Sequence, residues 1–491
     1  MLTVAEEQGL SGLALASQVQ HALYRLPEGE IAGLIERLRQ GALERHVFYL
    51  HDGELDPIRI LPCPITILPS QLSYIHAVTL ILQEALKRFP TLYFSDPRVR
   101  EILRLPDAEE RWLRECWGPS HVAHNPIFGR LDALIDFTSP MWRDSFRFVE
   151  PNLTGIGGLH MVPTSERLLA EIVVPALRSV DPDLHLEVGH DMRELLVREI
   201  LDHAAAIGSG SQVCFIEPKY SGEGPDEQEQ LAAYLRDRHG LTVSYADPSE
   251  LALHHGAVWC GDTRVDLAYR DYGVVDLLDL QEEGVDVEPM RTLLRENRVI
   301  SSIAAELDQK SCWEVLTNPE IAERHFTAQE RLVFQRHVLW TRVLSDRATV
   351  LPDGHTGSLL EYARTNHENL VLKPNRAYGG DGVVIGPAAT SAGWGAALDS
   401  ALADPDDRWV VQQVATIPVR EFPVLGPDGA LHAEPFYTVM GFAANEEGVA
   451  VLARASQKQV VNVAQRGGLC GVLVGRAPPL LEAAGEDGPG S

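Results

Sequence analysis

The sequence predicts an α/β protein with a mainly helical N-terminal region. From about residue 121 to 295, strand and helix patterns alternate: the buried stretch QVCFIEP precedes the helical stretch DEQEQLAAYLRDRHG, which precedes the strand LTVSYAD. Alternation of this kind argues for a largely parallel sheet. Residues 1–120 instead carry apolar residues at three- and four-residue spacing, which is typical of amphipathic helices.

The N-terminal region contains three long helical patterns and one shorter pattern. They lie in ASQVQHALYRL, EIAGLIERLRQGAL, QLSYIHAVTLILQEALKRF and DAEERWLRECW. Pro62, Pro64 and Pro69 mark an extended connection before the last long helix. No catalytic residue types gather here, so we interpret residues 1–120 as a scaffold that could also contribute to a substrate pocket.

The remaining chain is expected to form two further regions and a tail. In residues 121–295, FGRLDALIDF and FRFVEPN indicate paired strands, a helix is expected over SERLLAEIVVPAL, and the stretches AVWCGD and RVDLAYRDY read as strands. Residues 296–480 begin with a helical segment and continue as strands and turns. The tail, residues 481–491, is polar and glycine-rich and is predicted to be disordered.

Composition excludes several classes of protein. The 491 residues are 45% hydrophobic and 23% charged, as in an ordinary globular protein of two to four domains. No apolar run reaches the roughly 18 residues of a membrane span, and the acidic N-terminus does not look like a secretion signal. A net charge of −28 argues against a nucleic-acid surface. The six scattered cysteines predict reduced thiols in a cytoplasmic protein without a zinc site.

The stretch LVLKPNRAYGGDGVVIG is the first candidate for a binding site. Residues 370–372 indicate a buried strand with Lys373 at its end, and residues 383–385 indicate a second strand. Three glycines lie between them: Gly379, Gly380 and Gly382. Glycines allow backbone N–H groups to approach anionic oxygens closely, and a lysine adds a compact positive charge. The lysine precedes the glycines, so this is not the GxxxxGK[ST] phosphate loop, and a surface hairpin remains an alternative.

Lysine is rare in this chain, so each lysine is a candidate for a functional role. Only five of the 42 basic residues are lysines, and two of them, Lys310 and Lys373, fall in residues 296–480 with the glycine loop. Two ammonium groups could bind the phosphates of one nucleotide. The alternative for Lys310, in ELDQKSCWEVL, is a solvated helix position.

Two acidic motifs upstream form a candidate magnesium site. Alternation along a strand places Arg130 and Asp132 of FGRLD on one face, and Glu150 and Asn152 of FVEPN on one face of the neighbouring strand. Two carboxylates and an amide oxygen suit Mg²⁺ that bridges nucleotide phosphates. Arg130 could neutralise the charge that develops on a transferring phosphoryl group. The alternative is a salt-bridge cluster on a sheet.

Two later stretches could complete a nucleotide site. WVVQQV is a buried strand that ends in polar residues, whose backbone could bind the edge of adenine while Gln413 reaches the exocyclic amine. ARASQKQVVNVAQRGG could hold a carboxylate or an acyl phosphate through arginines and a glycine turn. Its candidate residues are Arg454, Asn462, Arg466, Gly467 and Gly468. A core strand with an exposed hairpin is the alternative.

The order of these motifs resembles that of circularly permuted ATP-grasp ligases, in particular eukaryotic-type glutathione synthetase and glutathionylspermidine synthetase. FGRLD and FVEPN are similar to FGRxD and the E-x-N strand of the latter. EPNLTGIGGL resembles the E-x-N stretch ending in GGL of the former, RVDLAYRDY its R-D-x-Y substrate strand, and KPNRAYGGDG its KPxRxGGG loop. PITILPSQL resembles a scaffold segment near the family's N-terminus. The resemblance extends from about residue 60 to 475.

The resemblance implies a cytoplasmic ATP- and Mg²⁺-dependent ligase in which ATP phosphorylates a carboxylate and an amine attacks the acyl phosphate. The expected substrates are amino acids, a small peptide or a polyamine. A homodimer is a possible assembly. The implied metal ligands are Asp132, Glu150 and Asn152. Arg130 and Arg454 are the implied catalytic residues. ATP would contact Lys310, Lys373, Gly379, Gly380, Gln412 and Gln413. Substrate would contact Arg270, Tyr272, Arg454, Gly467 and Gly468.

Two positions depart from the family pattern. Ala377 stands where glutathione synthetase has a metal-binding glutamate, and Ser456 stands where a nucleotide-binding lysine is expected. Asp381 or Glu434 are candidates to replace the missing carboxylate. We therefore expect a ligase of this class but not glutathione synthesis itself. A small-molecule kinase and a catalytically silent nucleotide-binding protein are the alternatives.

Overall fold

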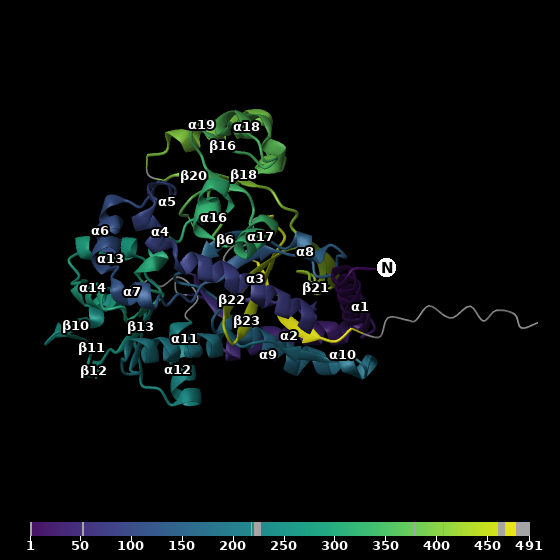
Figure 1. Ribbon diagram of the computed structural model, residues 1–491. Helices are drawn as coiled ribbons and strands as arrows, with labels where there is room; N and C mark the ends of the chain where they lie inside the picture. The colour runs from purple at the N-terminus through teal and green to yellow at the C-terminus, as the bar shows by residue number, and fades with distance from the viewer. Residues whose placement is uncertain are drawn as a thin grey trace, which may run out of the picture.

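A computed structural model describes residues 2–51, 54–217, 219, 227–377, 379–405, 407–459 and 467–477. Asn462, Arg466 and the tail predicted to be disordered lie outside the described residues. The chain is a mixed α/β protein (Figure 1), and its six cysteines are free. Within the described ranges, no helix is long and apolar enough to cross a membrane.

The N-terminal region is mainly helical, as predicted. Its helices are α1 (Val4–Tyr24), α2 (Glu28–Glu44), α3 (Pro69–Lys87), α4 (Phe89–Ser95), α5 (Pro97–Ile102), α6 (Asp107–Cys116) and α7 (Pro119–Ala123). Four short strands separate α2 from α3: β1 (Phe48–His51), β2 (Glu54–Pro57), β3 (Arg59–Ile60) and β4 (Ile65–Ile67). Thr3 and Glu6 form a capping box at the start of α1, and Pro69 occupies the first turn of α3, where a missing N–H costs nothing.

A four-stranded parallel sheet forms the centre of the second region. Its order is β14 (Val299–Ile300), β13 (Leu267–Arg270), β8 (Val213–Ile216) and β9 (Val243–Ala246), and all three pairings are parallel. Its neighbouring helices are α11 (Met192–Ile207), α12 (Gln228–His239), α13 (Val274–Glu282) and α14 (Glu288–Arg295). The predicted strand AVWCGD lies instead in a small antiparallel sheet of β10 (Leu251–His254), β11 (Ala257–Cys260) and β12 (Thr263–Arg264).

The helix predicted over SERLLAEIVVPAL is interrupted. It consists of α9 (Met161–Leu168) and α10 (Val174–Val180), joined by a π-helical turn over Leu169–Val173. Pro175 sits in the first turn of α10 and has no N–H to donate to the carbonyl four residues earlier, so the α-helical ladder is broken there.

A larger, mainly antiparallel sheet joins strands from the two halves of the chain. Its order is β3, β24 (Gly468–Leu469), β23 (Gly448–Ser456), β22 (Leu431–Asn445), β5 (Arg130–Leu134) and β6 (Arg147–Asn152), with β21 (Val419–Leu425) also paired to β22. The predicted pairing of FGRLD with FVEPN is confirmed. Both strands lie outside the parallel sheet, because the partner of β5 comes from a strand some 300 residues later. The division at residues 120 and 295 stays a prediction.

The glycine-loop hairpin belongs to a separate four-stranded sheet. Its order is β15 (Thr341–Val343), β20 (Trp409–Gln413), β18 (Leu370–Pro374) and β19 (Val384–Ile385). Figure 1 shows helices α18 (Leu359–Thr365) and α19 (Ser391–Ala403) over this sheet, at the top of the molecule. The remaining elements are α8 (Trp142–Ser145), β7 (Leu186–Val188), α15 (Cys312–Thr317), α16 (Pro319–His325), α17 (Ala328–His337), β16 (Ala348–Val350), β17 (Thr356–Ser358) and β25 (Val472–Gly475).

Candidate functional site

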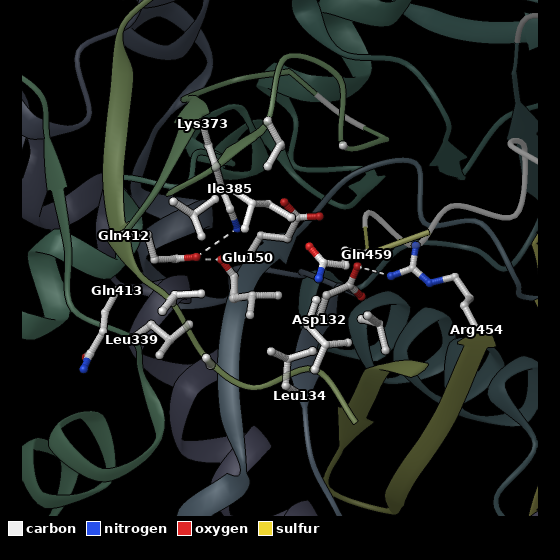
Figure 2. A pocket seen from close by; sticks show the side chains of 18 of the residues that line it. Asp132, Leu134, Glu150, Leu339, Lys373, Ile385, Gln412, Gln413, Arg454 and Gln459 are labelled. Atoms are coloured by element: carbon white, nitrogen blue, oxygen red, sulfur yellow. Dashed lines mark hydrogen bonds and ion pairs between the residues drawn. The ribbon is translucent and has the colours of Figure 1, made fainter. Parts of the chain in front are cut away.

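A cavity of about 190 Å³ lies between the large antiparallel sheet and the sheet of the glycine loop. Strands β5, β6, β22 and β23 supply one wall, and β18, β19 and β20 supply the other (Figure 2). The cavity brings together these predicted residues: Arg130, Asp132, Glu150, Asn152, Lys373, Gly379, Gly380, Gln412, Gln413 and Arg454. Residues more than 300 positions apart in the sequence therefore meet at one place.

The strand register places the acidic motifs side by side. Asp132 of β5 lies opposite Glu150 of β6, and Arg130 lies opposite Asn152. The pairing shifts between Asp132 and Ala133, at the point where the two carboxylates face each other. Adjacent strands are about 5 Å apart, so this register keeps the four polar side chains within one small area.

Asp132 is the buried centre of a charged cluster. The side chain is 1% exposed and accepts hydrogen bonds from Arg130 Nε at 2.8 Å and from Arg454 Nη2 at 2.5 Å. Burial alone would raise the pKa of the Asp132 carboxyl, but the two guanidinium groups together hold it below its ordinary value. Two arginines thus share one carboxylate, which leaves the cluster with a surplus of positive charge towards the cavity.

Gly441 of β22 makes room for this cluster. It pairs with Asp132 across the sheet, and a Cβ atom at this position would lie 2.6 Å from Arg130 Cδ and 2.7 Å from Asp132 Oδ1. The sequence analysis did not identify Gly441, because a glycine within a strand pattern does not reveal which side chain crosses over it.

Replacing Gly441 with alanine is therefore expected to displace the Arg130–Asp132 pair and to lower the free energy of unfolding by about 1–3 kcal/mol. Thermal unfolding of the purified variant measures this. Gly395→Ala in α19 is the control, since nothing lies within 4 Å of a Cβ at that position. Equal stability of the two variants would contradict the crowding argument.

Lys373 is held by a chain of hydrogen bonds. Its Nζ donates to Gln412 Oε1 at 2.9 Å, while Gln412 Nε2 donates to Val149 O at 3.0 Å and to Thr341 Oγ1 at 2.9 Å. Burial, reinforced by the nearby Lys310, lowers the pKa of Lys373 to about 8, although Glu150 opposes the shift. Because both ends of the Gln412 amide are bonded to protein, Gln412 orients Lys373 instead of presenting a free amide to adenine.

Lys310 reaches the same cluster from the turn before α15. It is 7% exposed, its Nζ donates to Ala377 O at 2.5 Å, and it lies 3.7 Å from Glu150 Oε2. The alternative of a solvated helix position is therefore wrong. Asn375, just after β18, accepts from Lys310 N at 3.1 Å and, through its side chain, from Ser311 N at 2.8 Å. These bonds tie the two lysine-bearing segments together.

The glycine-rich turn lies between two paired strands, as predicted. Gly379, Gly380 and Gly382 have φ values of 68°, 77° and 68°, in the left-handed region that favours glycine. The candidates for replacing the missing loop carboxylate do not line the cavity. Asp381 is exposed and accepts from Gly382 N, and Glu434 bonds to Gln457.

About half of the cavity lining is apolar. The apolar lining residues are Leu134, Val149, Leu339, Val371, Val383, Ile385, Val414, Ala415, Ile417 and Val439. None of them was predicted as a site residue, although the apolar stretches 370–372 and 383–385 on either side of the glycine loop were a signal. The exposed side chain of Gln413 extends away from Lys373 and Glu150 (Figure 2), and its contact with adenine stays a prediction. Gln459 also lines the cavity and was not predicted.

The other predicted substrate residues lie elsewhere. Arg270 is 1% exposed, and its guanidinium donates to Glu306 and to the carbonyl oxygens of Ser301, Ser302 and Tyr272. Tyr272 donates to Asp247 at 3.0 Å and lines a separate cavity. Gly468 is paired within the large sheet, and neither it nor Gly467 lines the main cavity. The R-D-x-Y pattern carried no signal that its arginine would be saturated by backbone carbonyls.

The donor set fits a magnesium ion only in part. The side-chain oxygens of Glu150 and Asn152 line the cavity and accept no hydrogen bond from any described residue. Both oxygens of Asp132, by contrast, are bonded to arginines. Across the described ranges, no three His, Cys, Asp or Glu side chains gather as metal ligands. Glu150 and Asn152 suit an ion whose remaining ligands are phosphate oxygens or water, and Asp132 can join only after the arginines release it.

Comparisons with known proteins show a similarity of fold. No protein-family model matches the sequence, and no curated protein matches it. Among solved structures, the chain is similar to a glutathione synthetase-like effector from Globodera pallida in its apo form, with a TM-score of 0.60 and 11% sequence identity. The similarity covers 91% of this chain and 97% of the effector chain. An identity this low concerns the fold alone: the chain has a mixed α/β fold similar to that of a glutathione synthetase-like protein.

Proposed function

We propose that the protein is an ATP- and Mg²⁺-dependent carboxylate–amine ligase of the circularly permuted ATP-grasp type. The observation that carries the proposal is the lining of one cavity, which combines apolar side chains with a cluster of charged groups. An adenine ring matches the apolar side chains, and a triphosphate matches Lys373, the glycine loop and the nearby Lys310. The fold similarity and the order of the sequence motifs support the same assignment.

The two lysines bind phosphate in this proposal. Lys373 supplies a charged donor whose direction is fixed by Gln412, and Lys310 supplies a second donor beside it. Gly379 and Gly380 add backbone N–H groups without side chains that would block approach. When bound, Mg²⁺ would neutralise charge on the phosphate oxygens, with Glu150 and Asn152 as its protein ligands.

The two arginines act on the reacting groups. In the free protein Arg130 and Arg454 are bonded to Asp132, and Arg454 Nε has no partner among the described residues. A phosphoryl group that enters the cavity offers them a second anion, so they stabilise the charge that develops during transfer to a carboxylate. Arg454 then orients the acyl phosphate for attack by the amine, and the products are an amide, ADP and phosphate.

The test is a coupled measurement of ADP and phosphate release with ATP, Mg²⁺ and a panel of amino acids, small peptides and polyamines, with mass spectrometry of the amide product. At least one pair of substrates should stimulate release. Glu150→Gln should lower kcat by about 100-fold or more, because it removes the carboxylate that would hold Mg²⁺ beside the phosphates. Glu36→Gln, in an exposed ion pair of α2, is the control. A stable phosphorylated product formed without amine would contradict the ligase assignment and indicate a kinase.

A second candidate is a nucleotide-binding protein without ligase activity. One observation favours it: Asp132 is bonded by two arginines, and Ala377 provides no carboxylate in the loop to assist a metal. Tight ATP binding without ADP release across the whole panel, and without any effect of Mg²⁺ on affinity, would support this candidate and contradict the ligase.

A further inference from the structure

A second cavity, of about 290 Å³, lies beside the first one. Its walls come from α1, from the connection before β4, from the residues after β5 and from β21. The two cavities share two stretches of chain. Leu134 and Ile417 line the first, while Asp136 and Arg420 line the second. The polar residues of the second cavity are Ser17, Gln20, Asp136, Thr138, Arg420 and Glu421.

Arg420 is the unusual member of this lining. It is half-buried, yet it makes no hydrogen bond or ion pair with any residue that the structure describes. Burial lowers the pKa of its guanidinium, and only the more distant Asp136 and two thiols oppose the shift. A cation that loses water without gaining a partner destabilises the fold, so Arg420 has no structural reason to be an arginine.

Asp136 supplies the opposite charge on the same cavity. Its Oδ1 accepts from Thr138 N at 3.0 Å and from Thr138 Oγ1 at 2.6 Å, which fixes the carboxylate in place. Asp136 and Arg420 nevertheless form no ion pair. Two opposite charges on the walls of one cavity, with no ion pair between them, fit a ligand that carries both charges itself.

The rest of the lining sets the size and polarity of that ligand. Leu13, Ile65 and Phe422 make part of the wall apolar. Cys63 is also in the wall, and burial raises the pKa of its thiol to about 11, so it is neutral at physiological pH. A volume near 300 Å³ is at the small end of ligand sites and suits a molecule of amino-acid size.

We propose that this cavity binds a free α-amino acid, with its carboxylate on Arg420 and its ammonium group on Asp136. An arginine fork matches a carboxylate with two parallel hydrogen bonds, and a fixed carboxylate is the natural partner of an ammonium group. The apolar wall receives the amino-acid side chain. The proposal stands apart from the ligase assignment, because no residue assigned to nucleotide binding lines this cavity.

Isothermal titration calorimetry of the full chain with each of the twenty protein amino acids tests the proposal. At least one should bind with a Kd in the micromolar to low millimolar range, while acetate and ethylamine, which carry one charge each, should bind at least 10-fold more weakly. Arg420→Met and Asp136→Asn should each weaken binding at least 10-fold. Lys373→Ala, which removes a cation from the first cavity, should leave it unchanged.

Thermal unfolding without ligand separates binding from a structural role. Arg420→Met should raise Tm, because it removes a half-buried charge that has no partner among the described residues, whereas a structural arginine would lower Tm when replaced. A lowered Tm, the absence of amino-acid binding to the unsubstituted protein, or binding that survives Arg420→Met but is lost in Lys373→Ala would each overturn the proposal.

Discussion

Replacing Lys373 with alanine is expected to weaken ATP binding by about 100-fold at pH 7, measured by isothermal titration calorimetry. The substitution removes a cation that Gln412 holds in one direction, and a hydrogen bond from a charged donor to phosphate contributes about 1.5–3 kcal/mol. Lys219→Ala is the control, because Lys219 pairs with Glu250 at the surface and does not line the cavity. Unchanged binding in Lys373→Ala would contradict the nucleotide assignment.

The pH dependence of ATP binding follows from the same side chain. Burial lowers the pKa of Lys373 to about 8 from an ordinary value of 10.5, so the free protein carries this charge below pH 8 and loses it above. The contribution of Lys373 to ATP affinity should therefore be nearly constant between pH 6.5 and 7.5. Above pH 8, the affinity should fall by up to about tenfold per pH unit. Binding above pH 8 should take up a proton. Lys373→Ala should abolish this pH dependence.

Replacing Asp132 with alanine is expected to give the largest loss of stability, about 3–5 kcal/mol in the free energy of unfolding, measured by urea denaturation at pH 7. The substitution leaves the guanidinium groups of Arg130 and Arg454 close together and without their shared anion. Asp202→Ala breaks the exposed pair with Arg198 and is the matched control, with an expected change below about 1 kcal/mol. Similar losses in the two variants would refute the idea that Asp132 anchors the cluster.

The contribution of Asp132 to the free energy of unfolding should decrease at low pH. The pKa of this carboxyl lies below its ordinary value in the folded protein. Its contribution to stability is therefore complete above the ordinary pKa of about 3.9, and it is lost as the pH falls through the lowered value. The difference in stability between the unsubstituted protein and Asp132→Ala should be constant from pH 7 down to about pH 5 and shrink at lower pH.

Local sequence patterns predicted the strands and the turn of the site, but they did not predict which distant strands pair with them. The patterns in FGRLD and FVEPN correctly predicted two paired strands, and the glycines correctly predicted a turn between the strands β18 and β19. The pairing of β5 with β22 was not predictable, because register between distant strands depends on the packing of the whole sheet. The sequence analysis therefore placed the acidic strands near the parallel sheet and overlooked Gly441.

Side-chain partners were harder still to predict. Gln412 was expected at adenine, but its amide is bonded to Lys373, Val149 and Thr341. Arg270 was expected to bind substrate, and backbone carbonyls with Glu306 take up its donors. Whether a polar group is satisfied by protein or left for a ligand depends on long-range contacts that no local motif contains. For the same reason, no local motif indicated that the Arg420 side chain would lack a partner among the described residues.

The position of β22 determines when the site can form during synthesis of the chain. β22 lies between β5 and β23, so β5 has no partner on that side until residues 431–445 have left the ribosome. A nascent chain that ends earlier already carries Asp132 and Glu150 but leaves the apolar residues of β5, Leu131 and Ala133, without the strand that covers them. This half of the site therefore folds only after β22 has been synthesised. Until then, the exposed strand edge is a target for chaperones and for aggregation.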